Sequence, residues 1–198
     1  MRNLDYAVTV KVQDRIDTSS HLRLASLVGN TMEGATFFAS PGFTVLVTLI
    51  VTGILLYDRR KKSCRVSGLI VPLALIAIVV FEIYGKSIVH HPSPPFAMVK
   101  HPTTIFPADY VNEQYSYPSG HAARSLFMAI IIGIALWREG IRKKYIYTGA
   151  ILLLSGYVLL VSVSKVYLGH HWFSDVVGGL LLGASFGLLS AITVLRKI

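Results

Sequence analysis

The sequence has few charged residues and almost no cysteine. Only 15% of its 198 residues are Asp, Glu, Lys or Arg, whereas soluble domains average about 25%. Cys64 is the single cysteine, so the chain can form no internal disulfide and no site with several cysteine ligands. Hydrophobic residues make up 53% of the chain, and the mean hydropathy is +0.59. These values exclude an ordinary soluble domain and indicate a polytopic membrane protein.

Acidic residues are also scarce, which leaves the chain strongly basic. There are 10 Asp and Glu against 19 Lys and Arg, and the formal net charge is +9. In a soluble protein such a charge favours a nucleic-acid partner. Here, however, eleven basic residues border apolar segments, as they do in the cytoplasmic loops of membrane proteins, so we expect no nucleic-acid partner. These residues are Arg59, Arg60, Lys61, Lys62, Arg65, Arg138, Arg142, Lys143, Lys144, Arg196 and Lys197.

Long apolar segments occupy most of the chain after residue 41. A helix needs about 20 residues to cross the hydrocarbon core, and four of the five segments have about that length. The first reaches it only if it begins near Phe37 or Phe38. We therefore expect an all-α fold, a polytopic membrane helical bundle with about five transmembrane helices. The segments run roughly over residues 44–57, 67–86, 119–137, 145–164 and 172–195.

Residues 1–41 contain no apolar run long enough to span a bilayer. Val8, Val10 and Val12 alternate with polar residues, and the stretch is too polar for a signal peptide. We expect it to form an amphipathic segment that lies on the membrane surface. The predicted organisation is therefore an interfacial N-terminal segment, residues 1–41, followed by one transmembrane domain, residues 42–198.

The basic loops predict the orientation in the membrane. If loops 58–66 and 138–144 are cytoplasmic, the proline-rich loop 87–118 and the turn 165–171 lie outside. Lys100 is the one Lys or Arg of loop 87–118, which agrees with this topology. The N-terminal segment also falls outside, although it carries four basic residues that the rule disfavours there. Three polar clusters then share the outer face, at 86–94, 117–124 and 164–175.

The second cluster begins an apolar helix with Tyr-Pro-Ser-Gly-His at residues 117–121. The first N–H groups of a helix have no internal partner and its dipole is positive there, so such a start attracts anions. His121 and Arg124 are three residues apart and share a face of the helix. Taken alone, the stretch could also be a helix cap beside an interfacial histidine.

The other two clusters contain groups that a helix places together. Lys86 ends one expected helix one turn after Glu82, although alone it could be an interfacial lysine. His171 and Asp175 are four residues apart, so the carboxylate can bind one imidazole nitrogen and leave the other as a nucleophile or base. A carboxylate one turn into a spanning helix is costly without a partner, which makes it a functional candidate. A purely structural His–Asp pair is the alternative.

Together the three clusters resemble the motifs of the type 2 phosphatidic acid phosphatase (PAP2) superfamily. That family has Lys, six residues and Arg-Pro; then Pro-Ser-Gly-His; then Ser-Arg, five residues, His, three residues and Asp. This chain has Lys86, six residues and Ser93-Pro94; Pro-Ser-Gly-His at 118–121; and Ser-Lys at 164–165, five residues, His171, three residues and Asp175. The order and the spacings match, and the resemblance covers roughly residues 40–195.

Two positions depart from the family's pattern. Ser93 replaces an arginine and loses its charge, while Lys165 replaces another and keeps the charge but not the bidentate guanidinium. Family members use both arginines to hold the phosphate, and Arg124 could replace part of what is missing. Members also commonly have six spanning helices, and we expect this chain to lack the first.

The resemblance implies a phosphohistidine mechanism that needs no metal or other cofactor. His171 would attack phosphorus, Asp175 would orient its imidazole, and His121 would protonate the leaving oxygen and then activate water. The groups that would hold the phosphate oxygens belong to Lys86, Ser119, Gly120, Lys165 and Arg124.

The implied substrate is a lipid phosphate or diphosphate presented at the outer leaflet. A polyprenyl diphosphate is favoured, with phosphatidylglycerophosphate and phosphatidate as further candidates. We expect an integral protein of a bacterial or archaeal plasma membrane, with the active site on the outer face and the bilayer lipid as its partner. The sequence leaves the oligomeric state open.

Three other functions remain open. The chain could be a relative that binds or scaffolds a lipid phosphate without efficient turnover, as the loss of the arginine at Ser93 would allow. The histidines on the outer side could bind a metal, although the adjacent pairs at 90–91 and 170–171 would point to different sides of a helix. The chain could also be a transporter, but the spacing of Gly179, Gly183 and Gly187 favours close helix packing over a pore lining.

Overall fold

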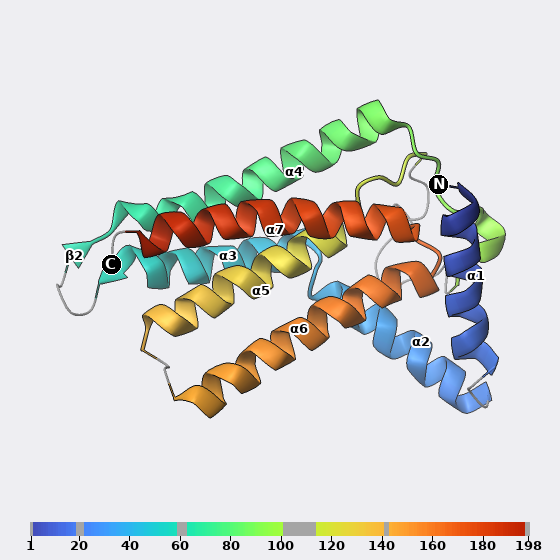
Figure 1. Cartoon of the computed structure of the whole chain (residues 1–198), viewed down its shortest axis with the longest axis horizontal. Coiled ribbons are helices and arrows are strands. Elements are labelled where there is room, and N and C mark those ends of the chain that lie inside the picture. Colours follow the sequence, from blue (N-terminus) through green and yellow to red (C-terminus); the bar gives the residue numbers. More distant parts are fainter. Residues whose placement is uncertain (1, 19–21, 59–62, 101–113, 141–142, 197–198) are drawn as a thin grey trace.

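The computed structural model describes residues 2–18, 22–58, 63–100, 114–140 and 143–196. Over these ranges the chain is almost entirely helical, which confirms the all-α prediction (Figure 1). Strands β1 (Tyr57–Asp58) and β2 (Ser63–Cys64) form only a short antiparallel pair at one end. The helices are α1 (Arg2–Thr18), α2 (Leu22–Phe37), α3 (Pro41–Leu56), η1 (Val66–Leu69), α4 (Ile70–Val89), η2 (Phe96–Met98), α5 (Gly120–Arg138), α6 (Lys144–Tyr167) and α7 (Phe173–Leu195).

Among the described residues, four helices are long and apolar enough to cross a membrane, namely Val66–Val89, α5, α6 and α7. The first expected span differs from its prediction, because the chain there breaks into Leu27–Phe37 and Pro41–Leu56, which meet at 50°. Ser40 accepts a hydrogen bond from the Phe43 N–H at 3.5 Å, and Pro41 is the first residue of α3. Such a pair starts a new helix, because Ser caps it and Pro has no N–H to continue the previous one. The expected helix therefore begins at Pro41, and a fifth span requires the bent pair to cross as one unit.

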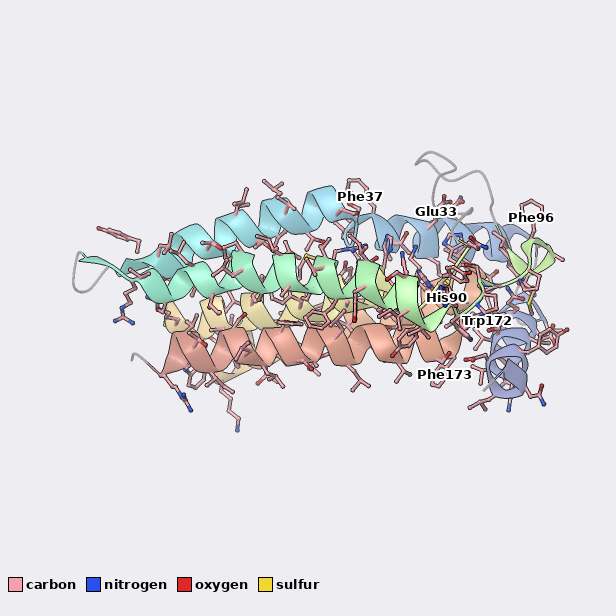
Figure 2. All side chains as sticks on the ribbon, turned by 90° about the horizontal axis from the view of Figure 1, so that it is seen from above. Glu33, Phe37, His90, Phe96, Trp172 and Phe173 are labelled. Carbon is pink, nitrogen blue, oxygen red and sulfur yellow. The ribbon has the colours of Figure 1, made fainter. Side chains whose placement is uncertain are left out.

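The outer faces of the spanning helices are apolar, and their side chains project along the whole bundle (Figure 2). Leu153 of α6 is 78% exposed and Leu181 of α7 is 65% exposed in the isolated chain. Soluble proteins rarely expose apolar surface on this scale. Together with the length of the helices, this surface identifies an integral membrane protein.

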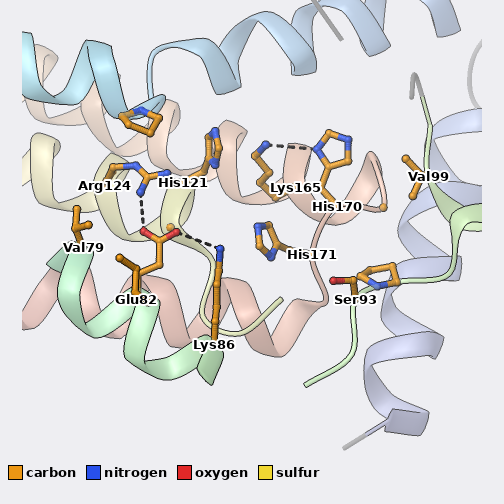
Figure 3. Close-up of a pocket in the computed structure, with 15 residues that line it drawn as sticks. Val79, Glu82, Lys86, Ser93, Val99, His121, Arg124, Lys165, His170 and His171 are labelled. Atoms are coloured by element: carbon orange, nitrogen blue, oxygen red, sulfur yellow. Dashed lines mark hydrogen bonds and ion pairs between the residues drawn. The ribbon is translucent and has the colours of Figure 1, made fainter. Parts of the chain in front are cut away.

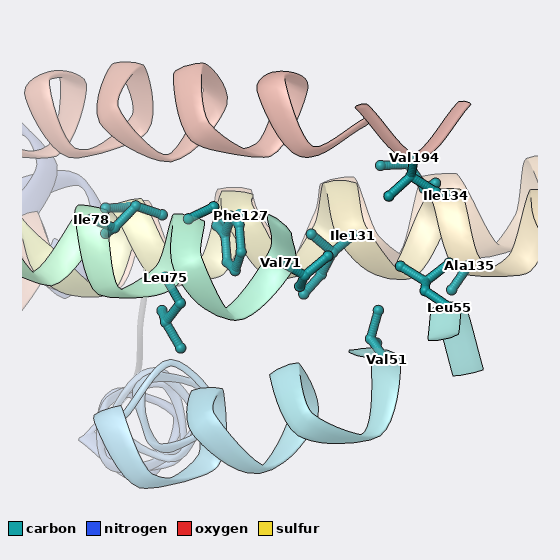
Figure 4. Packing of buried hydrophobic residues seen from close by; sticks show 12 residues of the cluster. Val51, Leu55, Val71, Leu75, Ile78, Phe127, Ile131, Ile134, Ala135 and Val194 are labelled. Carbon is teal, nitrogen blue, oxygen red and sulfur yellow. The ribbon is translucent and has the colours of Figure 1, made fainter. Parts of the chain in front are cut away.

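The hydrophobic core lies where α3, α4, α5 and α7 meet (Figure 4). Ile78, Phe127 and Ile131 are completely buried there. Helices α5 and α7 approach closely because Gly179 and Gly183 have no side chain. A Cβ at Gly179 would collide with the Ser119 carbonyl oxygen, and one at Gly183 with the backbone of Ala123 on α5. The prediction of close packing at these glycines is confirmed, and such packing is what holds helices together in lipid.

Helix α1 lies across one end of the bundle, beside the ends of α6 and α7 (Figure 1). The Gln13 side-chain amide donates to the carbonyls of Met98 at 2.8 Å and Tyr167 at 2.9 Å. Asp17 accepts a hydrogen bond from the Tyr167 hydroxyl at 3.0 Å and forms an ion pair with Lys100. The N-terminal residues thus form two helices, α1 and α2, and the expected division into an N-terminal segment, residues 1–41, and a transmembrane domain, residues 42–198, stays a prediction. Their position on a membrane surface remains a prediction.

The two ends of the bundle differ as the charge pattern predicts. The β1–β2 pair, the end of α5, the start of α6 and the end of α7 lie at one end, and helix α1 lies at the other (Figure 1). The end of α4, the start of α5 and the connection between α6 and α7 all meet at the end of the bundle where α1 lies. The three polar clusters therefore converge, while the membrane face toward which they point remains a prediction.

Candidate active site

The three clusters enclose a polar cavity of about 460 Å³ at the end of the bundle near α1 (Figure 3). Six of the eight predicted site residues line it, and the other two, Ser119 and Asp175, are completely buried. The helix ends position these side chains, because each polar cluster occupies the first or last turn of its helix. The six lining residues are Lys86, Gly120, His121, Arg124, Lys165 and His171.

Helix α5 supplies the predicted anion-binding start. Ser119 is its N-cap, and the Ser119 N–H donates to the Asp175 carbonyl at 2.9 Å, which ties α5 to α7. The Ser119 hydroxyl is buried and has no hydrogen-bond partner among the described residues. It does not line the cavity, so its predicted contact with phosphate would require it to reorient. His121 follows on the first turn and is only 5% exposed.

A carboxylate that the site prediction did not include lies beside this helix start. Glu82 forms ion pairs with Lys86 at 3.5 Å and with Arg124 at 2.6 Å (Figure 3). A Cβ at Gly120 would collide with the same carboxylate, which explains the need for glycine there. The expected Glu82–Lys86 helical pair is therefore present, and the carboxylate also reaches α5.

Arg124 is buried and binds two other parts of the chain. Its Nη1 donates to Glu82, and its Nε donates to the Ala39 carbonyl at 3.1 Å, at the break between α2 and α3. It lines the cavity as predicted, but two of its donors already have protein partners. Arg124 consequently ties α5 to both α4 and the α2–α3 bend.

His171 and Asp175 face each other at the start of α7, as their spacing predicts. The distance from His171 Nδ1 to Asp175 Oδ2 is 3.7 Å, and the same oxygen accepts the Trp172 N–H at 2.9 Å. Asp175 is completely buried, and His171 is 8% exposed at the cavity wall. With Nδ1 directed at the carboxylate, Nε2 is the nitrogen available to a substrate.

Asp175 has a closer imidazole partner that sequence reasoning missed. His91 Nδ1 lies 2.8 Å from Asp175 Oδ1, on the side of the carboxylate away from His171. His91 belongs to the loop that follows α4, and the sequence only indicated it as one of several outer histidines. Its position five residues after Lys86 was the only feature of the sequence that could have indicated a place near the site.

Lys165 also has a histidine partner. Its Nζ lies 3.4 Å from His170 Nδ1, and Lys165 is only 3% exposed. Burial, and then the charge of Lys165, lowers the pKa of His170 to about 3. His170 is thus neutral near pH 7 and can accept a hydrogen bond from the ammonium group. The sequence had raised His170 only as a potential metal ligand.

A second, more apolar pocket of about 510 Å³ adjoins the cavity at the α2–α3 bend. Both pockets share His121, Lys165 and His170, while Phe37, Phe43 and Leu46 supply apolar walls on the outer side. This arrangement places an apolar, laterally open surface directly beside the cationic cavity.

Ser93, which stands in place of the family's arginine, lines the polar cavity (Figure 3). The remaining cations of the lining are Lys86, Arg124 and Lys165, opposed by one carboxylate, Glu82. Over the described ranges, no group of three or more His, Cys, Asp or Glu side chains is arranged to hold a metal ion. The lining thus offers cations for an anionic group, and two of its three imidazoles, those of His121 and His171, suit nucleophilic and acid–base chemistry.

Comparison with known proteins places this arrangement in a family. Residues 42–198 match the family model described as the PAP2 superfamily. The chain is 32% identical over 167 residues to an undecaprenyl-diphosphatase of Sulfolobus acidocaldarius, spanning 81% of this chain and 69% of that protein. It is 26% identical over 162 residues to phosphatidylglycerophosphatase B of Bacillus subtilis, spanning 79% and 68%.

Two crystal structures share the fold. A transmembrane PAP2-type phosphatidylglycerolphosphate phosphatase of Bacillus subtilis superposes with a TM-score of 0.71 at 21% identity, covering 99% of this chain and 85% of that one. LpxE of Aquifex aeolicus superposes with a TM-score of 0.62 at 18% identity, covering 91% and 93%. At these identities the likeness concerns the fold alone.

Proposed function

The chain belongs to the PAP2 superfamily, and from that premise we propose that it is an integral membrane phosphatase of a lipid phosphate or diphosphate. One observation carries the proposal. Residues from three separate motifs bring a His–Asp pair, a second histidine and three cations to a single cavity. That set meets the needs of phosphoryl transfer to an enzyme nucleophile, because it supplies a nucleophile, an acid and countercharge.

In the proposed reaction, His171 Nε2 attacks phosphorus in line. The new P–N bond forms as the bond from phosphorus to the leaving oxygen breaks, and His121 donates its proton to that oxygen. Asp175 holds the Nδ1–H of His171 and stabilises the positive charge on the phosphorylated imidazole. Neutral His121 then removes a proton from water, which attacks phosphorus, releases phosphate and restores His171.

The phosphate oxygens would be held by the cations of the cavity and by the start of α5. Lys86 and Lys165 face the cavity from α4 and α6, and the Gly120 N–H belongs to the first turn of α5. Removing one donor aimed at developing charge typically costs about 3–4 kcal/mol of transition-state stabilisation. Arg124 would add to these donors once the anion displaces Glu82 from its guanidinium. Ser119 would add its hydroxyl after that group reorients toward the cavity. No metal enters the proposed reaction, because these donors supply the countercharge.

A polyprenyl diphosphate is the substrate we favour, with phosphatidylglycerophosphate and phosphatidate as further candidates. The relative from Sulfolobus acidocaldarius is an undecaprenyl-diphosphatase, and the relative from Bacillus subtilis is a phosphatidylglycerophosphatase. The apolar pocket at the α2–α3 bend suits a lipid chain whose phosphate group occupies the polar cavity. We place the site on the outer face of a bacterial or archaeal plasma membrane, since the basic loops lie at the opposite end of the bundle.

A second candidate is a lipid-phosphate binding or scaffold protein with weak turnover. Two features of the cavity favour this second candidate. Ser93 lacks the charge of the family's arginine, and Glu82 forms ion pairs with two of the three cations, Lys86 and Arg124. The intact His121, His171 and Asp175 favour the enzyme.

Phosphate release from a panel of lipid phosphates and diphosphates, measured with purified protein in detergent and EDTA, tests the proposal. We expect turnover that vanadate inhibits, that His171→Ala abolishes and that EDTA leaves unchanged. Loss of activity in EDTA would contradict the mechanism. Retained lipid binding without turnover of any substrate would establish the second candidate instead.

A further inference from the structure

His91 lies outside the motif residues that the proposed reaction uses, yet it makes the shortest side-chain contact to the buried carboxylate of the site. We infer that His91, supported by Asp5 of helix α1, is a positioning residue that holds Asp175 in place for His171. This inference rests on the proposed function. His91 is not among the residues that line the cavity, so its effect on the reaction would pass through Asp175.

The geometry around Asp175 assigns each carboxylate oxygen a separate role. Oδ1 lies 2.8 Å from His91 Nδ1, while Oδ2 lies 2.9 Å from the Trp172 N–H and 3.7 Å from His171 Nδ1. A carboxylate held at both oxygens cannot rotate freely about its terminal bond. The contact with His91 therefore keeps Oδ2 turned toward His171, where it can receive the Nδ1–H.

The backbone of His91 is itself fixed by contacts from distant parts of the chain. His90 ends α4 in the left-handed conformation, with φ 48°, which turns the following residues back toward the bundle end. The Ser116 N–H donates to the His91 carbonyl at 2.9 Å, and the Trp172 indole donates to the Pro92 carbonyl at 2.7 Å. These bonds attach the loop to the segment before α5 and to the start of α7, so the imidazole is pre-placed beside Asp175.

Asp5 connects helix α1 to the same group of residues. It is 3% exposed, and its Oδ2 lies 3.9 Å from His91 Nε2. Its two oxygens also accept the N–H and the hydroxyl of Ser174, each at 2.9 Å. Asp5 thereby caps the first turn of α7, the turn that carries Asp175, and faces the second nitrogen of His91. Helix α1 lies outside residues 42–198, which the family model matches.

Removing the His91 donor would leave a completely buried carboxylate oxygen without its nearest partner. An unpaired buried polar group is costly, so the Asp175 side chain would shift toward another donor. We expect this shift to slow the chemical step and to leave substrate binding nearly unchanged, because His91 and Asp5 do not line the cavity. Loss of kcat with little change in KM identifies this case.

Three variants separate positioning from general damage. His91→Leu removes the donor, His91→Asn keeps a donor near the Nδ1 position, and His90→Asn replaces the neighbouring imidazole, which packs on Tyr115 at 4.7 Å between ring centroids, with a residue that tolerates the left-handed backbone. We expect His91→Leu to lower kcat about 10- to 100-fold, comparable to the loss when the partner that orients a metal-binding side chain is removed. KM should change less than about threefold, His91→Asn should recover most of kcat, and His90→Asn should match the unmodified protein.

A second measurement does not depend on turnover. The ¹⁵N resonances of the His171 imidazole, assigned with His171→Gln, report its tautomer and the surroundings of Nδ1, which lies 3.7 Å from Asp175 Oδ2. They should change in His91→Leu, change less in His91→Asn and Asp5→Asn, and stay constant in His90→Asn. Unchanged His171 resonances in His91→Leu, or a kcat equal to that of the unmodified protein, would overturn the inference. Either result would leave the proposed function standing, since that function depends on turnover by the unmodified protein and its loss in His171→Ala.

Discussion

Glu82 Oε2 lies 2.6 Å from Arg124 Nη1, so a carboxylate occupies part of the cavity wall where a phosphate would need cations. The same side chain pairs with Lys86 at 3.5 Å and lies against Gly120 at the start of α5. Glu82 therefore partly neutralises the cations of the cavity. An anionic substrate has to compete with it for both cations.

Replacing Glu82 with glutamine tests this competition. Glu82→Gln keeps the shape but removes the negative charge, so we expect vanadate and inorganic phosphate to inhibit about 3- to 10-fold more tightly. Such a change corresponds to about 1 kcal/mol, as expected for a charge pair in a partly solvated site. Glu139→Gln, at the opposite end of the bundle, is the matched control. Weaker inhibition in Glu82→Gln would show that Glu82 instead holds the two cations in place.

Restoring the family's arginine at Ser93 should strengthen phosphate binding. Ser93 lines the cavity, and a hydrogen bond between charged groups contributes about 1.5 kcal/mol or more, which is about tenfold in affinity. We therefore expect Ser93→Arg to lower KM for a lipid phosphate about tenfold. Ser87→Arg adds the same charge at an exposed position on the last turn of α4 and should have little effect. Equal KM values in the two variants would argue against a phosphate site at Ser93.

The pKa of His170 predicts a loss of stability in acid. Burial and the Lys165 charge lower this pKa to about 3, from 6.5 in an unperturbed histidine. Between these values the unfolded chain binds a proton that the folded chain does not, so the free energy of unfolding falls as pH decreases from about 6.5 to 3. His170→Asn removes the titrating group and keeps an acceptor for Lys165. Its unfolding midpoint in detergent should fall less between pH 7 and pH 4 than that of the unmodified chain.

The control for His170 is His90→Asn, which removes an exposed imidazole at the end of α4. This variant should lose as much stability in acid as the unmodified chain. If His170→Asn loses the same amount as well, buried His170 is not responsible for the acid sensitivity.

The contact between α5 and α7 should tolerate no side chain at Gly183. A Cβ there would collide with the Ala123 backbone, whereas a Cβ at Gly156 of α6 would meet nothing within 4 Å. We expect Gly183→Ala to lower the free energy of unfolding by about 1–3 kcal/mol through overpacking. Gly156→Ala should be neutral or slightly stabilising, because Ala favours the helix. The midpoints of thermal unfolding in one detergent compare the two, and equal midpoints would contradict the close approach at Gly183.

Local patterns predicted much of the fold and most of the site. Four spans followed from apolar runs of sufficient length, and the pairing of His171 with Asp175 followed from a spacing of one helical turn. The break before α3 also has a local signal, the Ser40-Pro41 pair, but the apolar run across it concealed the end of α2 at Phe37. The family motifs indicated five of the predicted site residues that line the cavity, and the helical spacing from His121 indicated the sixth, Arg124.

Contacts between distant segments could not be predicted in this way. The direction of His91 depends on Ser116 and Trp172, which lie 25 and more residues away and fix the loop after α4. Glu82 looked like half of a simple helical pair, and only the approach of α5 shows that its carboxylate also reaches Arg124. No local pattern indicated that Asp5 lies near the site, because its contact with Ser174 depends on where α1 crosses the bundle.

By itself, the sequence determined the membrane class, the helices and the chemistry of the site, because apolar length, helical spacing and residue type are local properties of the chain. The tertiary structure alone decided which charges oppose each other in the cavity and which imidazole lies closest to Asp175. Those outcomes depend on distances between helices that are far apart in the sequence. A shift of one or two ångströms there forms or breaks a hydrogen bond without changing any local pattern.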